Sequence, residues 1–441
     1  MENPDSHKSR EEPRIERITA EVRDDGTLVE LVFDPHRNQT SFVIWEGDQW
    51  RVTSSLSSGD NRRILPWSAD NNLIKTGALV LPSAPEEYGS ERELIDEIQA
   101  YIHRYVDLSP AFERLASYYV LLSWVYDAFN EVPYLRVRGD YGTGKTRFLL
   151  VVGALCYKAF FASGASTVSP IFHTLNAFRG TLVIDEADFR FSDEKAEIVK
   201  ILNNGNVRGV PVLRTMITTA REYNPTAFHV FGPKLVATRG EYRDPALETR
   251  FLTEEMGGGR LREDVPINLP AEYANQALRL RNKLLLYRMR NYHRAGIDTS
   301  LIDPTLEPRL NQIFMPLKSV VGEEAFRDEL TSAARALQGA FIASRGFEIE
   351  TQLLEVIRGL IDRNSSAVPL KAITSSFIRR YGDQHDWKIT NQQIGGVIRR
   401  KLHLKMQKSD GVYVIPATEM PRLGVLFARF GVEPAPSTKG R

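Results

Sequence analysis

The spacing of hydrophobic positions changes along the chain, and each change marks a different kind of element. Apolar and polar residues alternate over 27–33 and again over 42–52, with Asp-Gly and Gly-Asp turn signals beside them. A period of two around such turns is typical of β-hairpins. The pattern predicts a small β-rich domain over 15–88. The polar, charged segment 1–14 before it predicts a disordered leader.

Helical periodicity follows, and then strands and helices alternate. Ser90 and Glu93 form a capping box that opens a helix over 90–106, and a second apolar helix is expected over 109–129. Further strands and helices are predicted in turn at 134–137, 145–157, 159–162, 168–177 and 181–185. Such alternation indicates a parallel sheet covered by helices, so we expect an α/β core over 89–270.

The remainder of the chain is predominantly helical. We expect a helical section over 271–345 and a smaller unit over 346–416. The smaller unit is predicted to contain helices 348–362, 370–381 and 391–402, followed by a hairpin at 404–415. Three helices and a hairpin are typical of a winged helix-turn-helix. The proline-containing segment 417–441 predicts a flexible tail.

A phosphate-binding motif lies between the first predicted core strand and its helix. Its residues are Gly139, Asp140, Tyr141, Gly142, Thr143, Gly144, Lys145 and Thr146, which satisfy G-x-x-x-x-G-K-[ST]. In such a loop the backbone N–H groups surround phosphate oxygens, and the lysine reaches the β and γ phosphates. We therefore predict a site for ATP, with Thr146 holding Mg²⁺. The alternative, a glycine-rich turn without a ligand, is disfavoured by the strand and helix on either side.

Two later strands are expected to complete this site. The first ends at Asp185 and Glu186, of which Asp185 would bind Mg²⁺ through water and Glu186 would polarise the attacking water. The second, over 233–238, ends at Thr238, whose hydroxyl could touch that water or the γ-phosphate. The letters DEAD at 185–188 also occur in DEAD-box RNA helicases. Those motors have two tandem RecA-like domains, and no second such domain follows here.

The segments GDYGTGKT, LVIDEAD, KLVAT and ALETRF, in this order, resemble the motifs of AAA+ ATPases. The resemblance implies a P-loop core with Thr238 at the sensor position and Arg250 at the arginine-finger position. In that family the arginine acts on the nucleotide of the neighbouring subunit, which implies a homo-oligomeric ring, expected to be a hexamer. Arg239 and Arg243 are rivals for this role, and a surface salt bridge is the alternative for Arg250.

The same resemblance extends into the helical section and beyond. The segment 307–317 looks like the family's helical lid, with Arg309 at the second sensor position for the nucleotide; a solvated side chain is the alternative. Within AAA+, residues 110–416 are similar to the MCM-related replicative helicases of phages, plasmids and genomic islands, in which a winged helix follows the motor. The small β-rich domain lies outside this resemblance.

The implied activity is an ATP-dependent DNA helicase or translocase that acts in replication of a mobile element or phage. The primase domain that many such proteins carry is lacking in this sequence, so a separate primase or replication initiator is an expected partner. Two alternatives share these motifs. One is an ATP-switched DNA-binding or helicase-loading factor that unwinds nothing. The other is a protein-remodelling machine, which the winged helix disfavours.

Charge is informative in the C-terminal unit, where nine Lys or Arg residues stand against two Asp residues between Lys371 and Lys408. We expect duplex DNA there, and single-stranded DNA in a central channel lined by the insertion 203–223. The predicted DNA contacts are Asn391, Gln392, Gln393, Arg399, Arg400, Lys401, Lys405, Lys408, Arg208 and Arg214. A winged helix that binds protein, and an insertion that is only a solvated connector, are the alternatives.

Composition favours a cytoplasmic protein. The single cysteine, Cys156, allows no internal disulfide and no cysteine-based zinc site, which fits a reducing compartment. The N-terminus is polar where a secretory signal would be apolar. The apolar stretch 118–129 is too short to span a membrane, and 148–166 is interrupted by Lys158 and glycines, so we expect no membrane partner.

Overall fold

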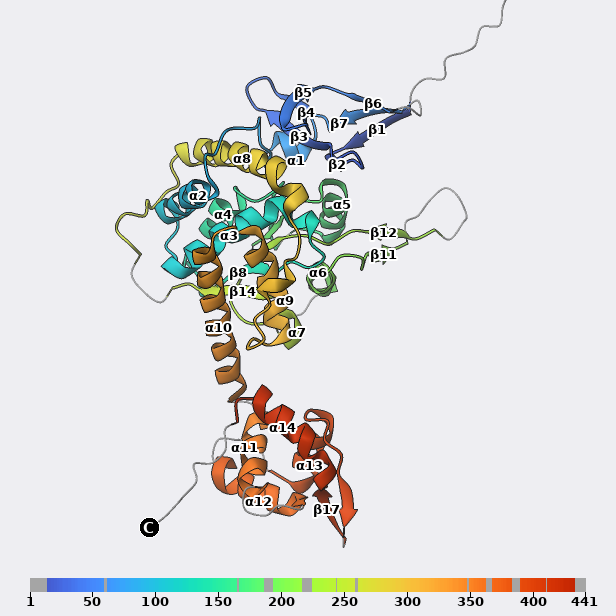
Figure 1. The fold of residues 1–441 in the computed structure, drawn as a ribbon, viewed down its shortest axis with the longest axis vertical. Coiled ribbons are helices and arrows are strands. Elements are labelled where there is room, and N and C mark those ends of the chain that lie inside the picture. Colours follow the sequence, from blue (N-terminus) through green and yellow to red (C-terminus); the bar gives the residue numbers. More distant parts are fainter. Residues whose placement is uncertain are drawn as a thin grey trace, which may run out of the picture. The chain divides into compact units, whose positions relative to one another are not determined.

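A computed structural model describes most of the chain (Figure 1). The described residues are 14–58, 62–164, 166–185, 193–215, 224–242, 244–257, 261–346, 349–361, 367–382, 389–409 and 411–432. The chain divides into two compact units, Met1–Thr331 and Ser332–Arg441. No helix in the described part of the chain is long and apolar enough to cross a membrane.

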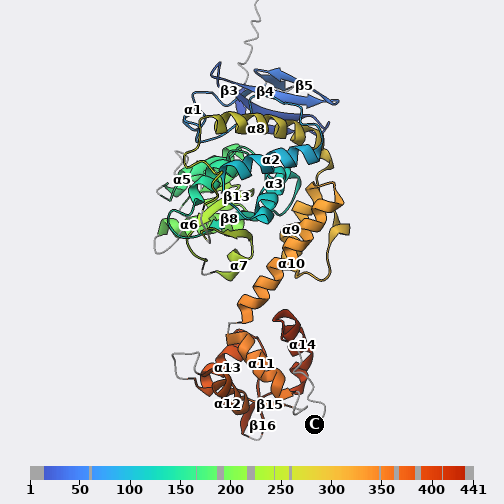
Figure 2. The ribbon, with the colours of Figure 1, turned by 90° about the vertical axis from the view of Figure 1, so that its left-hand side faces the viewer.

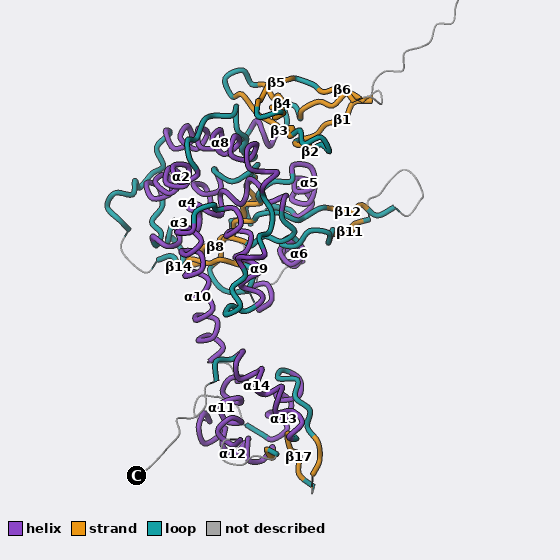
Figure 3. The backbone as a smooth tube through the Cα atoms, in the orientation of Figure 1, coloured by secondary structure: helices purple, strands orange, loops and turns teal. Residues whose placement is uncertain are grey.

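A five-stranded parallel sheet forms the centre of the first unit, in the order β14-β8-β13-β10-β9 (Figure 3). The strands are β8 (Tyr134–Arg138), β9 (Phe160–Ala162), β10 (Leu182–Ile184), β13 (Lys234–Thr238) and β14 (Phe251–Glu255). Strands buried on both faces need continuous apolar runs, which is why β8, β10 and β13 were recognisable in the sequence. The carboxyl ends of β8, β10 and β13 meet at one edge, where ligands bind in such sheets.

Helices connect the strands and pack around the sheet, and the last of them, α10, extends away from it (Figure 2). They are α2 (Glu91–Tyr105), α3 (Pro110–Val125), α4 (Lys145–Gly153), α5 (Val168–Phe178), α6 (Asp193–Asn204), α7 (Pro245–Glu248), α8 (Glu272–Asn291), α9 (Pro308–Val320) and α10 (Glu324–Gly346). The capping box that opens α2 has formed, because Ser90 Oγ accepts from the Glu93 N–H and the Glu93 carboxylate accepts from the Ser90 N–H. Both predicted N-terminal helices therefore begin where the sequence placed them.

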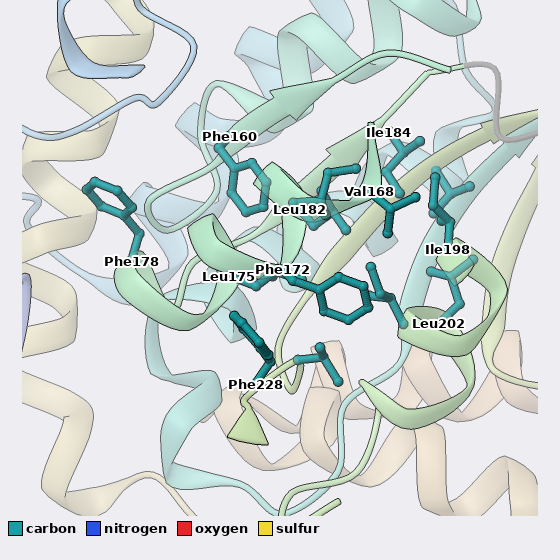
Figure 4. Packing of buried hydrophobic residues seen from close by; sticks show 14 of the residues in the cluster. Phe160, Val168, Phe172, Leu175, Phe178, Leu182, Ile184, Ile198, Leu202 and Phe228 are labelled. Carbon is teal, nitrogen blue, oxygen red and sulfur yellow. The ribbon is translucent and has the colours of Figure 1, made fainter. Parts of the chain in front are cut away.

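An antiparallel hairpin emerges from the first unit between α6 and β13. It pairs β11 (Val212–Arg214) with β12 (Thr226–Phe228), and it occupies part of the insertion predicted at 203–223. Its base is fixed by packing, since Phe228 joins Phe172 of α5 and Leu202 of α6 in one hydrophobic cluster (Figure 4). The residues 216–223 lie outside the described part of the chain.

The buried ammonium of Lys234 also fixes this insertion. It donates to the carbonyls of Gly205 (3.2 Å), Val230 (2.9 Å) and Gly232 (2.9 Å), which flank the hairpin on both sides. Each of its three N–H bonds thus meets an acceptor, as a fully buried cation requires.

Burial lowers the pKa of Lys234 from 10.5 to about 7. Between pH 7 and pH 10 the unfolded chain therefore binds more protons than the folded chain, and the free energy of unfolding should rise with pH. We expect the free energy of unfolding of the wild type, minus that of Lys234→Met, to rise by about 1 kcal/mol per pH unit across this window. Urea denaturation at pH 7 and pH 9 measures it. A difference that is flat or falls with pH would contradict the assignment.

The N-terminal region forms two small sheets, as its period-two pattern predicted. One is antiparallel, in the order β2-β3-β4-β5, and the other has the order β1-β7-β6. The strands are β1 (Arg14–Ile18), β2 (Ala20–Val22), β3 (Leu28–Asp34), β4 (Gln39–Glu46), β5 (Gln49–Thr53), β6 (Leu56–Ser58) and β7 (Arg62–Pro66), and a short helix α1 (Asn72–Lys75) follows. These sheets belong to the same compact unit as the motor.

A buried ionic network joins the N-terminal sheets to the α/β part of the first unit. The Glu30 carboxylate on β3 accepts from Lys158 (3.0 Å), from Arg288 of α8 (2.6 Å) and from the Tyr157 hydroxyl (2.8 Å). Arg288 also pairs with Asp127 (2.6 Å). The side chains of Glu30, Lys158 and Arg288 are at most 2% exposed. Removing one partner from such a network leaves a buried charge, which costs about 3–5 kcal/mol, so the junction is rigid.

The section predicted as a separate lid, 271–345, does not form a separate unit in the structure. Its first helix, α8, packs against α2 and α3. Arg281 donates to the carbonyls of Leu81 (3.1 Å) and Ala154 (2.7 Å), which ties α8 to the motor. The division between the two units falls after Thr331, inside the continuous helix α10. Side-chain hydrogen bonds of this kind leave no trace in a hydrophobic pattern, so the sequence did not reveal them.

The second unit contains the three helices and the hairpin that the sequence predicted. They are α11 (Ile349–Ile361), α12 (Leu370–Tyr381), α13 (Asn391–Arg400), β16 (Gln407–Ser409) and β17 (Val412–Ile415). A further strand, β15 (Val368–Pro369), adds to β17 in an antiparallel sheet. The flexible tail predicted from residue 417 is wrong over its first part, where α14 (Met420–Arg429) forms. Leu423 and Phe427 of α14 are buried in the core of this unit.

Candidate functional site

The phosphate loop connects β8 to α4 in a conformation that needs its glycines. Gly142 (φ 74°) and Gly144 (φ 93°) adopt left-handed backbone angles that side chains disfavour. At Gly139 a Cβ atom would approach the carbonyl oxygen of Met256 to 2.4 Å. The loop can therefore pass this close to the residues after β14 only with glycine at position 139.

Lys145 is held inside the loop, at the first turn of α4. Its Nζ donates to the carbonyls of Gly139 (2.7 Å) and Asp140 (2.5 Å), and Thr143 Oγ1 donates to the same Asp140 carbonyl (2.9 Å). The ammonium and the α4 N-terminus thus contribute positive potential to one small space. That combination suits the phosphates of a nucleotide.

The carboxylate of Asp185 meets the loop from the end of β10. Thr146 Oγ1 donates to Asp185 Oδ2 at 2.6 Å, although the two residues belong to different elements. They line a cavity of about 390 Å³ whose other lining residues are Tyr141, Gly142, Thr143, Gly144, Lys145, Arg147 and Arg239. A hydroxyl and a carboxylate are hard oxygen ligands of the kind that Mg²⁺ takes beside phosphate, so the donor set fits this ion.

Thr238 ends β13, which lies between β8 and β10 in the sheet. Its side chain is 1% exposed, and its Oγ1 has no hydrogen-bond partner among the described residues. Because buried hydroxyls are normally paired, this one is available to a partner other than the described residues. In the sheet, Thr238 therefore lies between the strand that leads into the phosphate loop and the strand that ends before Asp185.

Arg239, the next residue, belongs to the same cavity. Its guanidinium lies 3.8 Å from the centroid of the Tyr141 ring and donates to the Tyr141 hydroxyl. The sequence interpretation weighed Arg239 as a residue acting on a neighbouring subunit, whereas the structure places it at its own chain's phosphate loop. The sequence could have indicated this position, because a residue that directly follows a strand of the parallel sheet lies at the edge of the sheet where the phosphate loop is.

Arg250 lies at the opposite strand end, immediately before β14. Its Nε donates to Asn206 Oδ1 (2.9 Å), and its Nη1 donates to Asn203 Oδ1 (2.8 Å) and to the Ala246 carbonyl (3.0 Å). These contacts orient the guanidinium on the far side of the sheet from the phosphate loop. Of the two asparagines that hold it, Asn203 lies in the last turn of α6 and Asn206 shortly after it, and neither was singled out as a site residue from the sequence.

The turn before Arg250 is anchored by a bidentate ion pair. Arg136 of β8 donates to both carboxylate oxygens of Glu248, at 2.7 and 2.5 Å. The Arg136 side chain is only 3% exposed, which makes this contact between β8 and α7 costly to break.

Arg309 does not reach the phosphate loop, which corrects the expectation for it. It lies at the first turn of α9, where its Nη1 donates to Gln312 Oε1 at 2.6 Å. Burial, followed by the nearby positive charge of Arg250, lowers the pKa of Arg309. Arg309 lines a cavity with Asn130 and Glu131, shortly before β8 begins, so it lies at the same edge of the sheet as Arg250. Five residues of β8 separate their edge of the sheet from the loop, roughly 15 Å.

Several predicted site residues lie outside the described part of the chain. Glu186, predicted to polarise the attacking water, is one of them. Arg243, the other rival for the trans-acting role, is a second.

The predicted DNA contacts differ in how free their side chains are. Asn391, Gln392, Arg400, Lys405 and Lys408 are exposed. Others are engaged: Gln393 Oε1 accepts from Thr390 in a capping box, Arg399 donates to the Gly395 carbonyl (3.1 Å), Lys401 pairs with Glu350 (2.5 Å), and Arg214 pairs with Glu197 and stacks over Phe172. Arg208 is exposed and donates to the Asp127 carbonyl. The contacts of Gln393 and Arg399 are local, whereas the ion pairs of Lys401 and Arg214 depend on tertiary neighbours that a local pattern does not specify.

No family model matches the chain, and no curated protein sequence matches it. Among solved structures, the apo C-terminal region of NrS-1 is similar with a TM-score of 0.37 and 12% identity, over 88% of this chain and 96% of that chain. The X-ray structure of JCV helicase is similar with a TM-score of 0.24 and 12% identity, over 56% of this chain and 61% of that chain. Both TM-scores are below 0.5, so no conclusion about this chain is drawn from either similarity.

Proposed function

We propose that this protein is an ATP-dependent DNA helicase or translocase that acts in replication of a mobile element or phage. The observation that carries the proposal is the convergence of Lys145, Thr146 and Asp185 on one cavity at the carboxyl edge of a parallel sheet. Loading of a partner without unwinding remains the alternative from another functional class.

Each residue at the cavity has a role in this proposal. Thr146 and Asp185 would hold Mg²⁺, which neutralises phosphate charge when bound. Lys145 exchanges its two carbonyl contacts for the β and γ phosphates. The unpaired Thr238 hydroxyl hydrogen-bonds the γ-phosphate or the attacking water, and Glu186 takes the proton of that water.

Arg250 acts across a subunit interface in this proposal, since it lies on the opposite side of the sheet from its own loop. A ring of identical subunits would bring it to the neighbour's nucleotide. We extend the same role to Arg309, because it lies at the same edge of the sheet as Arg250 and away from its own loop. A hexamer is the expected closed ring.

The second unit serves as a winged helix that binds duplex DNA. Its support is the order of α11, β15, α12, α13 and the β16–β17 hairpin, together with exposed Arg400, Lys405 and Lys408. The exposed Asn391 and Gln392 at the start of α13 would face base edges. The β11–β12 hairpin and Arg208 would contact single-stranded DNA in the channel of the ring.

ATP hydrolysis and fork unwinding measured on the same preparation test the proposal. A motor should displace a strand only while it hydrolyses ATP, whereas a loader should hydrolyse ATP and displace none. Arg208→Glu should reduce unwinding by at least about tenfold and leave DNA-independent hydrolysis within about twofold of wild type. Arg37→Glu, the same charge reversal on the exposed β3–β4 turn, is the matched control. Hydrolysis by an assembled ring without any displaced strand would refute the helicase.

A further inference from the structure

A second, larger cavity lies in the first unit, away from the phosphate loop. It measures about 720 Å³, within the range of roughly 300–1,000 Å³ seen for ligand sites and larger than the 390 Å³ at the loop. The N-terminal segment 17–22 forms one wall. The residues 208–211, before β11, and 229–231, after β12, form the other. We call this cavity the N-terminal cleft.

Within the part of the chain that the structure describes, the cleft has more cationic side chains than acids that pair with them. Arg17, Arg179 and Arg208 line it, and no described carboxylate pairs with any of them. The two acids in the lining have other partners, since Asp127 is paired with Arg288 and Glu21 with Arg23. Arg179 and Arg208 are exposed to solvent, so their guanidinium groups are accessible to an anion.

Aromatic side chains lie among these cations. Trp67, Phe231 and Tyr292 are half-buried in the lining. The Arg208 guanidinium lies 5.3 Å from the centroid of the Phe231 ring. Cations that meet phosphates, interleaved with rings on which bases stack, are the features by which proteins hold single-stranded nucleic acid. A small anion or an acidic peptide would make no use of the rings.

The backbone of the cleft is held in an uncommon conformation. Arg179 has φ 49° at the C-terminus of α5, and Lys158, with φ 43°, also lines the cleft. The Tyr126 hydroxyl donates to the Arg179 carbonyl at 2.5 Å, which fixes this backbone position. A left-handed residue is a common way for a helix to end, and Arg179 is the C-cap of α5. This helix ending places the Arg179 side chain on the cleft.

We propose that the N-terminal cleft binds single-stranded DNA, as a path that continues from the base of the β11–β12 hairpin across the N-terminal sheets. Its volume admits one or two nucleotides and excludes a duplex. The inference deepens the proposed function, because the hairpin would hand the strand to the cleft or receive it from there. Both ends of the hairpin contribute to the cleft wall, so a strand held by the hairpin would reach the cleft at the hairpin's base.

Binding of a fluorescein-labelled oligothymidylate of about 20 nucleotides to the full chain tests this, by anisotropy over a range of salt concentrations. Arg179→Glu should weaken binding by about tenfold and reduce the slope of log K against log salt by about 0.7, as expected when one phosphate contact to a single strand is lost. Arg179→Lys should retain most of the affinity. Duplex binding and DNA-independent ATP hydrolysis should not change.

Arg37→Glu is the matched charge-reversal control, because Arg37 lies on the exposed β3–β4 turn outside the cleft. A second readout uses 4-thiothymidine in the oligonucleotide, which should cross-link to peptides that contain Trp67 or Tyr292. Wild-type affinity and salt slope in Arg179→Glu would overturn the proposal. Cross-links confined to the second unit would also overturn it, as would displacement of the oligonucleotide by polyglutamate at equal charge concentration.

Failure of the cleft can be told apart from failure of the motor. Lys145→Ala should bind the oligothymidylate as wild type does, since the cleft and the phosphate loop share no lining residue. Intact binding without ATP hydrolysis in the wild type would refute the motor and leave the cleft. If the wild type hydrolyses ATP and unwinds DNA normally, and Arg179→Glu binds the oligonucleotide as the wild type does, the cleft is refuted and the motor stands.

Discussion

Lys145→Ala should lower kcat for ATP hydrolysis by at least about 100-fold, the effect of removing one preorganised donor from developing charge. Lys145 is the cation in the phosphate loop, held by two loop carbonyls within a cavity that also contains Thr146 and Asp185. A coupled assay of phosphate release at saturating Mg-ATP measures the change.

Two comparisons make this result specific. Lys75→Ala, at an exposed position at the end of α1, should retain wild-type hydrolysis. Asp185→Asn should raise the Mg²⁺ concentration needed for half-maximal rate, because it removes the carboxylate that faces Thr146. If Lys145→Ala turns over ATP at the wild-type rate while the thermal midpoint is unchanged, the motor interpretation fails.

Arg250→Ala should reduce hydrolysis by about 10³-fold or more, the range observed for arginine fingers. Mixing it one-to-one with Lys145→Ala should recover about one quarter of wild-type activity, since one interface in four then joins an intact loop to an intact arginine. Activity of the mixture, compared with each variant alone, measures this. No recovery in rings of verified mass would contradict a shared site.

The same mixing experiment decides the role of Arg309. If Arg309 acts across the interface beside Arg250, Arg309→Ala should recover activity with Lys145→Ala and none with Arg250→Ala. If it acts on its own chain's nucleotide, Arg309→Ala should recover activity with Arg250→Ala and none with Lys145→Ala. Arg250→Lys serves as a folding control, because it retains a donor for Asn203 or Asn206.

Much of the motor was predictable from local sequence. Strands β8, β10 and β13 are largely buried and therefore appear as short, mostly apolar runs, although β8 contains the buried Arg136 and β13 begins with the buried Lys234. The loop from Gly139 to Thr146 can be recognised in the sequence by its glycines. Its backbone tolerates only glycine where φ is positive or where another backbone segment comes close. The capping box at Ser90 and Glu93 is likewise a contact between residues three apart, which the sequence specifies by itself.

Contacts between distant residues were decided only by the tertiary structure. The resemblance gave Arg309 the second sensor position, with a solvated side chain as the alternative, and the folded structure places it in a cavity with Asn130 and Glu131. The sequence also assigned α14 to a flexible tail, since two buried side chains, Leu423 and Phe427, are too few to identify a helix without its partners. The N-terminal cleft is of the same kind, because its walls come from segments about 190 residues apart.

The sequence by itself therefore determined the elements and the chemistry of the phosphate loop, where backbone conformation and short-range spacing are sufficient. The tertiary structure decided which polar and charged side chains meet. These pairs are Thr146 with Asp185, Arg239 with Tyr141, and Glu30 with Lys158 and Arg288. The physical reason is that secondary structure follows from interactions within a few residues. The environment of a charged side chain depends instead on which strands are adjacent in the folded sheet.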